Sequence, residues 1–292
     1  EMLRSLVGSE MCIRDRGRNL RSVNTDGGVN LQFKLLSAIG IIIIVSGHCY
    51  HGGMELAYNW FPPYSYNLAL FVFISGYFYK TDYEENIGKY IWKRTKRLLI
   101  PAYLWNIFYG GMVAFLGLFG FTIGAKPDLY NLFVMPFVDG EAFQYNLGSW
   151  FVYPLFLVCI INVLFRKFLK LIHLDNEFIV LIVYLAIGMI GINTAIGNPT
   201  AINGIVKLLV RTMFFLPCYE FGRFYKAVLE KKDTLNNVAY FAIIFAVQLI
   251  LLTFCKDLEY TPSSFTKFNN GFIIPYISSI TAIAFWLRVS RL

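Results

Sequence analysis

The sequence predicts an all-α fold, a polytopic transmembrane helical bundle of about eight spans with a cytoplasmic N-terminus. The composition is the first reason: 57% of the 292 residues are hydrophobic and 15% are charged, whereas soluble domains carry about 25% charged residues. The second is that apolar residues gather in segments near the roughly 20 residues that a spanning helix needs. The third is that basic residues cluster between these segments, so the net charge of +8 reflects membrane topology rather than nucleic-acid binding.

Each apolar segment is a candidate membrane span. The segments cover residues 32–50, 64–79, 98–121, 149–165, 177–197, 204–224, 236–255 and 272–288. The second segment is short, and the sixth is interrupted by charged residues. The long apolar runs predict helices, because a backbone inside a bilayer must satisfy its own hydrogen bonds.

Clusters of Lys and Arg follow alternate segments. The largest are Lys93, Arg94, Lys96 and Arg97 after the second segment, Arg166, Lys167 and Lys170 after the fourth, and Arg223, Lys226, Lys231 and Lys232 after the sixth. In contrast, the connection 51–63 has no Lys or Arg. Because positive charges stay on the cytoplasmic side, this alternation places the N-terminus and the basic clusters in the cytoplasm and requires an even number of spans.

The chain divides into a short start and one membrane domain. The string SLVGSEMCIRDR, from Ser5 to Arg16, resembles a translated sequencing-adapter artefact, so residues 1–16 are set apart from the fold. Residues 17–30 are expected to form a cytoplasmic tail, and residues 31–292 a single transmembrane domain.

The outer connection 122–148 contains the apolar stretch LYNLFVMPFVDG, which is too short to span a bilayer. We expect it to lie over the bundle as an interfacial or re-entrant piece. The cysteines show no paired spacing, so neither a metal site nor a disulfide framework is predicted.

His48 ends the first apolar segment. An imidazole at the edge of a bilayer is costly unless it has a partner or a task, although an interfacial histidine that reaches toward water is the simpler interpretation. Lys34 lies fourteen residues before His48, which is about 40° apart around a helix. Lys34, Ser37 and His48 are therefore predicted to form a polar stripe that faces the bundle interior. His51 follows at i+3, but a metal pair would lack an evident third ligand.

Arg211 lies inside the sixth segment. An intramembrane arginine indicates a functional or paired site, and Glu220, nine residues further on, lies near the opposite side of the helix. We expect Arg211 to bind a partner on another helix or to line a water-filled cavity, as part of a pore or donor path.

Four motifs occur in a fixed order along the chain: VSGH ending at His48, LFVFISGYFYK from Leu70 to Lys80, KRTKRLLIP from Lys93 to Pro101, and GSWFVYPLF from Gly148 to Phe156. Together, over roughly residues 30 to 225, they resemble the membrane acyltransferase type 3 family, close to its sugar O-acetyltransferase branch. The resemblance implies that His48 is the histidine essential for acyl transfer, and Trp150 matches a family position. The family has Arg or Lys eleven positions before that histidine, where this sequence has Ser37; Lys34, one turn earlier, is the candidate replacement.

The resemblance also implies a donor and a chain length. A coenzyme A donor brings phosphates, which Lys93, Arg94 and Arg97 could bind by charge-assisted hydrogen bonds; the alternative is that this cluster only sets topology. No permanently bound cofactor is expected, acyl-CoA (acetyl-CoA) being a substrate. The family has about ten spans, which predicts that the C-terminus is truncated.

The predicted function is that of a membrane O-acyltransferase in a bacterial plasma membrane. It would move an acyl group, most simply acetyl, from cytoplasmic acyl-CoA to a sugar hydroxyl of a cell-surface glycan or glycolipid, with His48 as base or as acyl carrier. The main alternative is a glycan transporter or flippase without acyl-transfer activity, using Arg211 and residues 122–148. We find no inverted repeat of the kind that transporters often carry. A structural membrane subunit is a third possibility.

Overall fold

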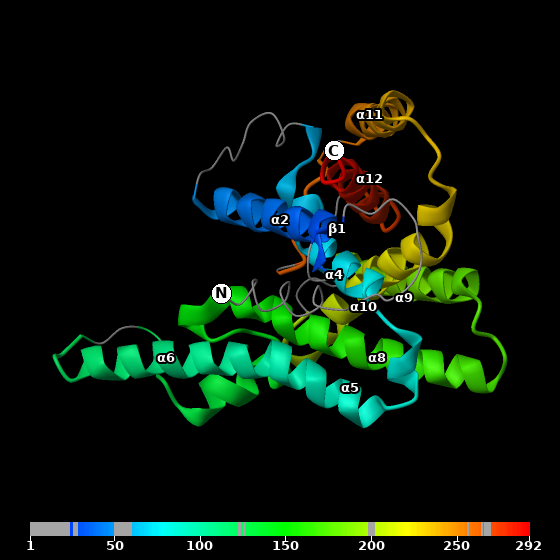
Figure 1. Cartoon of the computed structure of the whole chain (residues 1–292). Helices are drawn as coiled ribbons and strands as arrows, with labels where there is room; N and C mark the ends of the chain where they lie inside the picture. Colours follow the sequence, from blue (N-terminus) through cyan, green and yellow to red (C-terminus); the bar gives the residue numbers. More distant parts are fainter. Residues whose placement is uncertain are drawn as a thin grey trace.

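The computed structural model describes residues 24–25, 29–49, 60–121, 124, 126–197, 202–255, 257–263, 265 and 270–292. Helices make up most of this part of the chain (Figure 1). Ahead of the first helix, the strands β1 (Asn24–Thr25) and β2 (Val29–Asn30) form a short antiparallel pair. The prediction of an all-α bundle is confirmed, while residues 1–16 lie outside the described part.

The helical elements follow one another along the chain. They are α2 (Leu31–Cys49), η1 (Pro63–Ser65), α4 (Asn67–Tyr77), η2 (Thr81–Glu84), α5 (Ile87–Arg94), η3 (Thr95–Leu99), α6 (Ile100–Gly117), η4 (Tyr130–Val134), α7 (Met135–Val138), η5 (Gln144–Phe151), α8 (Val152–Leu171), α9 (Glu177–Gly197), α10 (Gly204–Phe224), η7 (Tyr225–Leu229), η8 (Glu230–Lys232), α11 (Asn237–Phe254) and α12 (Ile274–Val289).

Every predicted span contains one of these helices. Five helical stretches of the described chain are long and apolar enough to cross a membrane: Leu31–His48, Ile87–Gly117, Gln144–Leu171, Glu177–Gly197 and Asn237–Phe254. The helices α4 and α12 are apolar but shorter. Helix α10 has 21 residues, but Lys207, Arg211, Glu220 and Arg223 lower its hydropathy. The count of eight spans and the cytoplasmic N-terminus stay predictions.

Helix α10 lies at the centre of the molecule and packs closely against α4. At Gly76 of α4, a Cβ atom would lie 1.8 Å from the carbonyl oxygen of Tyr219. At Gly222 of α10, a Cβ atom would lie 1.9 Å from the carbonyl oxygen of Phe73. Only glycine permits the two backbones to approach this closely, so the crossing fixes how α10 sits in the bundle.

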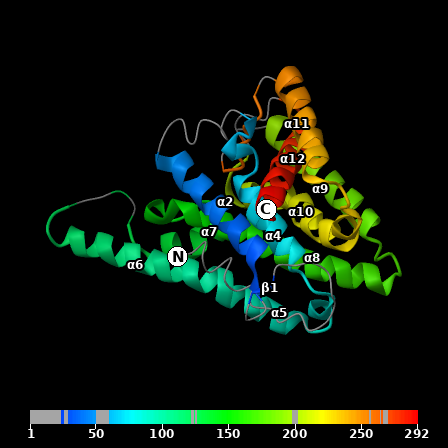
Figure 2. The same ribbon diagram turned by 45° about the horizontal axis from the view of Figure 1, so that its top comes forward.

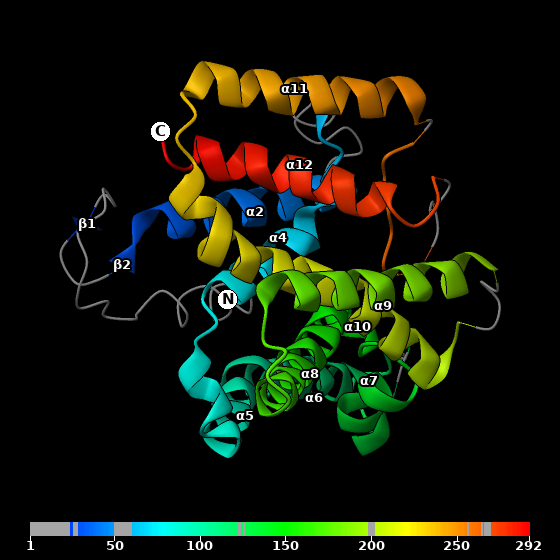
Figure 3. The same cartoon turned by 90° about the vertical axis from the view of Figure 1, so that its right-hand side faces the viewer.

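Helices α11 and α12 lie side by side and run across the direction of α6 and α8 (Figures 1, 2 and 3). Only 11% of the span in α11 is buried. Its apolar side chains, among them Val238 and Phe254, are largely exposed. A wide exposed apolar surface on a helix of this length is the pattern expected where lipid is the surrounding medium.

Candidate functional site

His48 lies in the last turn of α2, where its side chain is exposed. The Tyr64 ring lies edge-on to the His48 ring, with 6.4 Å between ring centroids. The Tyr64 hydroxyl donates a hydrogen bond of 3.1 Å to the carbonyl oxygen of Gly47. Because the last carbonyls of a helix have no partner within it, Tyr64 stabilises the turn that carries His48. His51 lies outside the described residues.

The predicted polar stripe does not run through the bundle interior. Ser37 is buried, and its hydroxyl donates a 2.7 Å hydrogen bond to the carbonyl oxygen of Phe33. Lys34 and His48, however, are exposed. The buried face of α2 contains Phe33, and Lys34 lies about 100° from it around the helix. The prediction that the stripe faces inward is therefore wrong at both of its ends.

The basic cluster after α4 is held against tyrosine rings. Lys93 donates a 3.0 Å hydrogen bond to the Tyr83 hydroxyl, and the Arg94 guanidinium lies 5.0 Å from the centroid of the Tyr90 ring. Tyr83 and Tyr90 stack on each other with centroids 4.6 Å apart. Arg94 is buried, whereas Arg97 is half-buried. Cations over aromatic faces are stabilised by the ring quadrupole, so these contacts give the cluster a defined structure, and its role in donor binding stays a prediction.

Two arginines and two glutamates form a charge network between α8, α9 and α10. Arg166 donates from Nη2 to both carboxylate oxygens of Glu220, at 2.6 and 2.7 Å, and to Glu177 at 2.7 Å. Arg223 donates to Glu177 from Nε at 3.1 Å and from Nη2 at 2.9 Å. Arg166 and Glu220 are almost fully buried. A buried charge is tolerated only when it is paired and hydrogen-bonded, and this pairing ties the three helices together.

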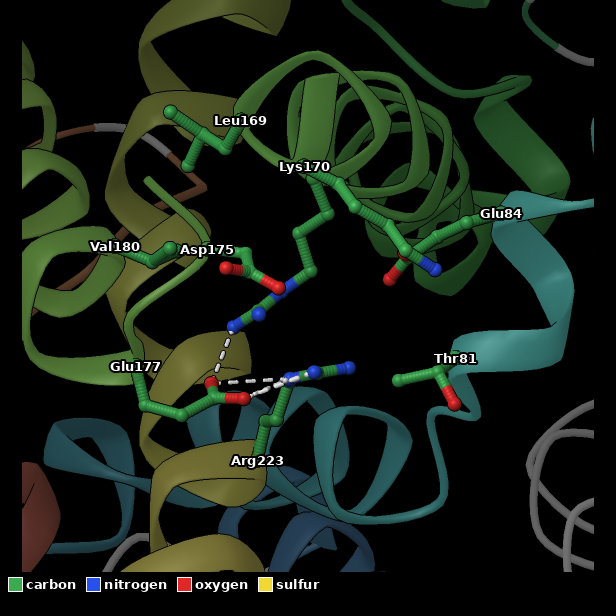
Figure 4. Close-up of a pocket in the computed structure, with 9 residues that line it drawn as sticks. Thr81, Glu84, Leu169, Lys170, Asp175, Glu177, Val180 and Arg223 are labelled. Atoms are coloured by element: carbon green, nitrogen blue, oxygen red, sulfur yellow. Dashed lines mark hydrogen bonds and ion pairs between the residues drawn. The ribbon is translucent and has the colours of Figure 1, made fainter. Parts of the chain in front are cut away.

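A cavity of about 220 Å³ opens beside this network (Figure 4). Its lining residues are Thr81, Glu84, Arg166, Leu169, Lys170, Asp175, Glu177, Val180 and Arg223. The Arg223 guanidinium lies between Glu177 and Thr81, and Lys170 Nζ lies 3.9 Å from Glu84 (Figure 4). Within the described ranges, no group of three or more His, Cys, Asp or Glu side chains is placed to hold a metal ion. The sequence prediction missed this cavity, although Glu220, an acidic residue inside an apolar segment, was a signal for a buried partner.

Arg211 is buried and binds backbone carbonyls. Its Nε donates to the carbonyl oxygen of Pro262 at 3.2 Å, and its two Nη atoms donate to the carbonyl oxygens of Gly140 and Ser263. The guanidinium lies 4.5 Å from the centroid of the Trp150 ring. The expected partner on another helix is replaced by two connecting segments, because a fork of N–H donors fits carbonyl groups as well as carboxylates. Arg211 does not line the cavity beside Glu177, and its role in a pore or donor path stays a prediction.

The outer stretch LYNLFVMPFVDG is helical, forming η4 and α7. Asn106 of α6 donates a 2.7 Å hydrogen bond to the Leu132 carbonyl oxygen, and Asn146 donates at 2.7 Å to the Asn106 side chain. On the exposed side, Tyr130 donates to Asp139, and this hydrogen bond raises the pKa of Tyr130. Asn106 thus fastens the stretch to α6, and the Tyr130–Asp139 hydrogen bond joins two parts of the stretch itself.

The comparisons with known proteins identify the domain that contains these sites. The family model of acyltransferase 3, described as an acyltransferase domain, matches residues 30–292. The chain belongs to the acyltransferase 3 family. His48, the tyrosine-bound cations and the cavity all lie within the matched residues. No curated protein and no solved structure matches the chain.

The family and the apolar helices together identify a membrane acyltransferase. The resemblance of the four sequence motifs to this family is confirmed. The sugar O-acetyltransferase branch and the truncated C-terminus stay predictions, as do the roles of the individual residues.

Proposed function

We propose that this acyltransferase moves an acetyl group from cytoplasmic acyl-CoA to a sugar hydroxyl of a cell-surface glycan or glycolipid in a bacterial plasma membrane. The family supports the transfer of an acyl group. The position of His48 supports it as the reactive group: it is an accessible imidazole at the end of an apolar helix, beside the Tyr64 ring. The exposed end of α2 gives a polar acceptor access without requiring it to enter the apolar bundle.

The chemistry of imidazole suits the proposed reaction. As a base, His48 takes the proton of the sugar hydroxyl while the oxygen attacks the thioester carbonyl carbon. The carbon–sulfur bond then breaks, and the leaving thiolate takes that proton back from the imidazolium. As a carrier, His48 would itself attack the thioester carbonyl carbon and release the CoA thiolate. The sugar hydroxyl would then attack the acyl-imidazole, which frees the ring nitrogen, and the hydroxyl proton would pass to the thiolate. Both routes use a ring nitrogen of the imidazole, as base or as nucleophile.

The donor phosphates are proposed to bind beside α5. Lys93 and Arg97 are half-buried, so each keeps part of its surface available to a ligand. Arg94 is buried against Tyr90, and its positive charge would attract the phosphates without touching them. Arg97 also lies in the π-helical segment η3, ahead of Pro101, which has no N–H for the Arg97 carbonyl. Irregular helical turns of this type are frequent at functional sites.

The test compares His48→Ala with the unmodified chain in a strain that carries the acceptor glycan. We expect the acyl content of the surface glycan, measured by mass spectrometry, to fall at least a hundredfold, the order of a lost general base. Membrane abundance should be unchanged. His173→Ala is the matched control, because His173 is exposed in the turn after α8.

Unchanged acylation in His48→Ala would exclude His48 as the reactive group. Glycan retained inside the cell in this variant, with acylation intact, would instead support the transporter alternative. A donor requirement is tested in the same membranes by adding labelled acetyl-CoA and following label into glycan.

A further inference from the structure

The cavity beside the charge network has a lining whose charges cancel. Three cations, Arg166, Lys170 and Arg223, face three carboxylates, Glu84, Asp175 and Glu177. Glu177 already binds both arginines, and Glu220 binds Arg166 from behind. A bare anion therefore gains little net attraction here. The best-matched ligand is an uncharged group that carries both hydrogen-bond donors and acceptors.

The lining offers hydrogen-bond donors that the network leaves unused. Arg166 makes its carboxylate contacts through Nη2, and its Nε is buried, without a surface that a ligand in the cavity could contact. Arg223 uses Nε and Nη2 on Glu177, which leaves Nη1 on a guanidinium that extends toward Thr81 (Figure 4). The Thr81 hydroxyl adds one more donor on that side. A ligand with acceptor atoms would pair with these donors of Arg223 and Thr81.

The other side of the cavity offers a hydrogen-bond acceptor. Asp175 is exposed at the rim and, within the part of the chain that the structure describes, has no hydrogen-bond partner. A carboxylate at this place accepts from an amine, as Asp and Glu do when they bind the exocyclic amines of nucleobases. The planar Arg223 guanidinium, with its central carbon 4.9 Å from the centroid of the Tyr79 ring, provides a wall suited to a flat ligand.

The cavity also adjoins the cations proposed for the donor phosphates. Thr81 and Glu84 belong to η2, and so does Tyr83, which binds Lys93 of α5. Lys170, at the cavity rim, has 55% of its side chain exposed. A ligand whose nucleobase occupies the cavity would thus have Lys93 and Lys170 on two sides of the cavity entrance.

We propose that this cavity binds the adenine base of the acyl-CoA donor. Asp175 accepts from the exocyclic amine, while Arg223 Nη1 and the Thr81 hydroxyl donate to ring nitrogens. The phosphates lie outside the cavity, near Lys93 and Lys170. The inference rests on the proposed function, because it names a subsite for the donor of that reaction.

The test uses two donors with the same thioester: acetyl-CoA and acetyl-pantetheine, which lacks the nucleotide. In Asp175→Asn we expect the KM for acetyl-CoA to rise about tenfold, the effect of a weakened hydrogen bond to a charged group. In Thr81→Val it should rise about fivefold. The kcat/KM for acetyl-pantetheine should stay within about twofold in both variants. Asp82→Asn is the matched control: Asp82 is exposed in η2 but does not line the cavity.

A donor with hypoxanthine in place of adenine sharpens the assignment. Hypoxanthine carries a carbonyl where adenine carries the exocyclic amine. The KM of the hypoxanthine donor should therefore be about tenfold higher than that of acetyl-CoA in the unmodified chain. In Asp175→Asn the two donors should differ by much less, because the partner of the amine is already changed.

A binding measurement without acyl transfer tests the adenine subsite separately from the proposed reaction. Adenosine 3′,5′-bisphosphate, titrated calorimetrically into the purified full chain, should bind about tenfold more weakly to Asp175→Asn. Equal affinity in the two proteins would overturn the adenine subsite, even if the chain transfers acyl groups. An equal loss with both donors would overturn it too. Failure of acyl transfer together with the expected change in affinity would reject the reaction and retain the nucleotide site.

Discussion

Two deeply buried arginines, Arg166 and Arg211, are held in opposite ways. Arg166 binds carboxylates on two other helices, so its charge is neutralised within the bundle. Arg211 binds the backbone carbonyls of two connecting segments and lies on a tryptophan ring, so its charge stays uncompensated by direct contact. The first arrangement joins helices to one another, and the second joins loops to a helix.

These two arrangements predict different losses of stability when the arginine side chain is removed. Without Arg166, the fully buried Glu220 would lose the cation that it contacts, and removing one partner of a buried ion pair is among the most destabilising changes in a protein interior. Without Arg211, only neutral carbonyls lose a partner, and such groups cost less to leave unsatisfied. The three changes below test this contrast, in order of decreasing effect.

Arg166→Leu should have the largest effect, lowering the free energy of unfolding by about 3–5 kcal/mol. Thermal unfolding in detergent measures the change. The double variant Arg166→Leu, Glu220→Leu is the control: it removes both charges and leaves Glu177 paired with Arg223, so most of the stability should return. A double variant no more stable than Arg166→Leu would mean that packing, and not the unpaired carboxylate, explains the loss.

Arg211→Leu should cost less, about 1–3 kcal/mol. Because Arg211 fastens the segments around Gly140 and Pro262, limited proteolysis should cut these segments faster in the variant. Arg211→Lys should not restore protection, since an ammonium cannot reproduce the planar fork of donors. Equal losses of stability in Arg211→Leu and Arg166→Leu would break the comparison.

Lys207→Gln should have the smallest effect. Lys207, one turn before Arg211 in α10, pairs with Glu141. Half of the Glu141 side chain is exposed, and exposed ion pairs contribute about 0.2–1 kcal/mol to stability. The midpoint of thermal unfolding should move by no more than a few degrees, and less at high salt. A shift as large as that of Arg211→Leu would show that this surface pair, rather than the carbonyl contacts, secures the outer segment.

The sequence predicted the helices well because lipid imposes a length on them. Segments 177–197 and 204–224 coincide with α9 and α10, since charged or glycine residues interrupt the apolar runs at their ends. Segment 64–79 was longer than α4 because Pro63 and the residues beside it form the separate turn η1 instead.

The site was less accessible to sequence reasoning. Helical geometry gave the angle between Lys34 and His48, but it could not say which face of α2 its neighbours would cover. The charge network was missed for a related reason: Arg166 and Glu220 are 54 residues apart, and only the packing of α8 against α10 brings them together. The conflict between Glu220 and its apolar surroundings was visible in the sequence, although its partner was not.

The spacing within the charge network has a consequence for how the chain is made. Glu177 follows Arg166 by 11 residues, whereas Glu220 follows by 54. During synthesis the hairpin of α8 and α9 can therefore enter the bilayer with its arginine already matched by a carboxylate on the next helix. Helix α10, which brings Glu220 and Arg223, then joins a pair whose buried arginine already has a carboxylate partner.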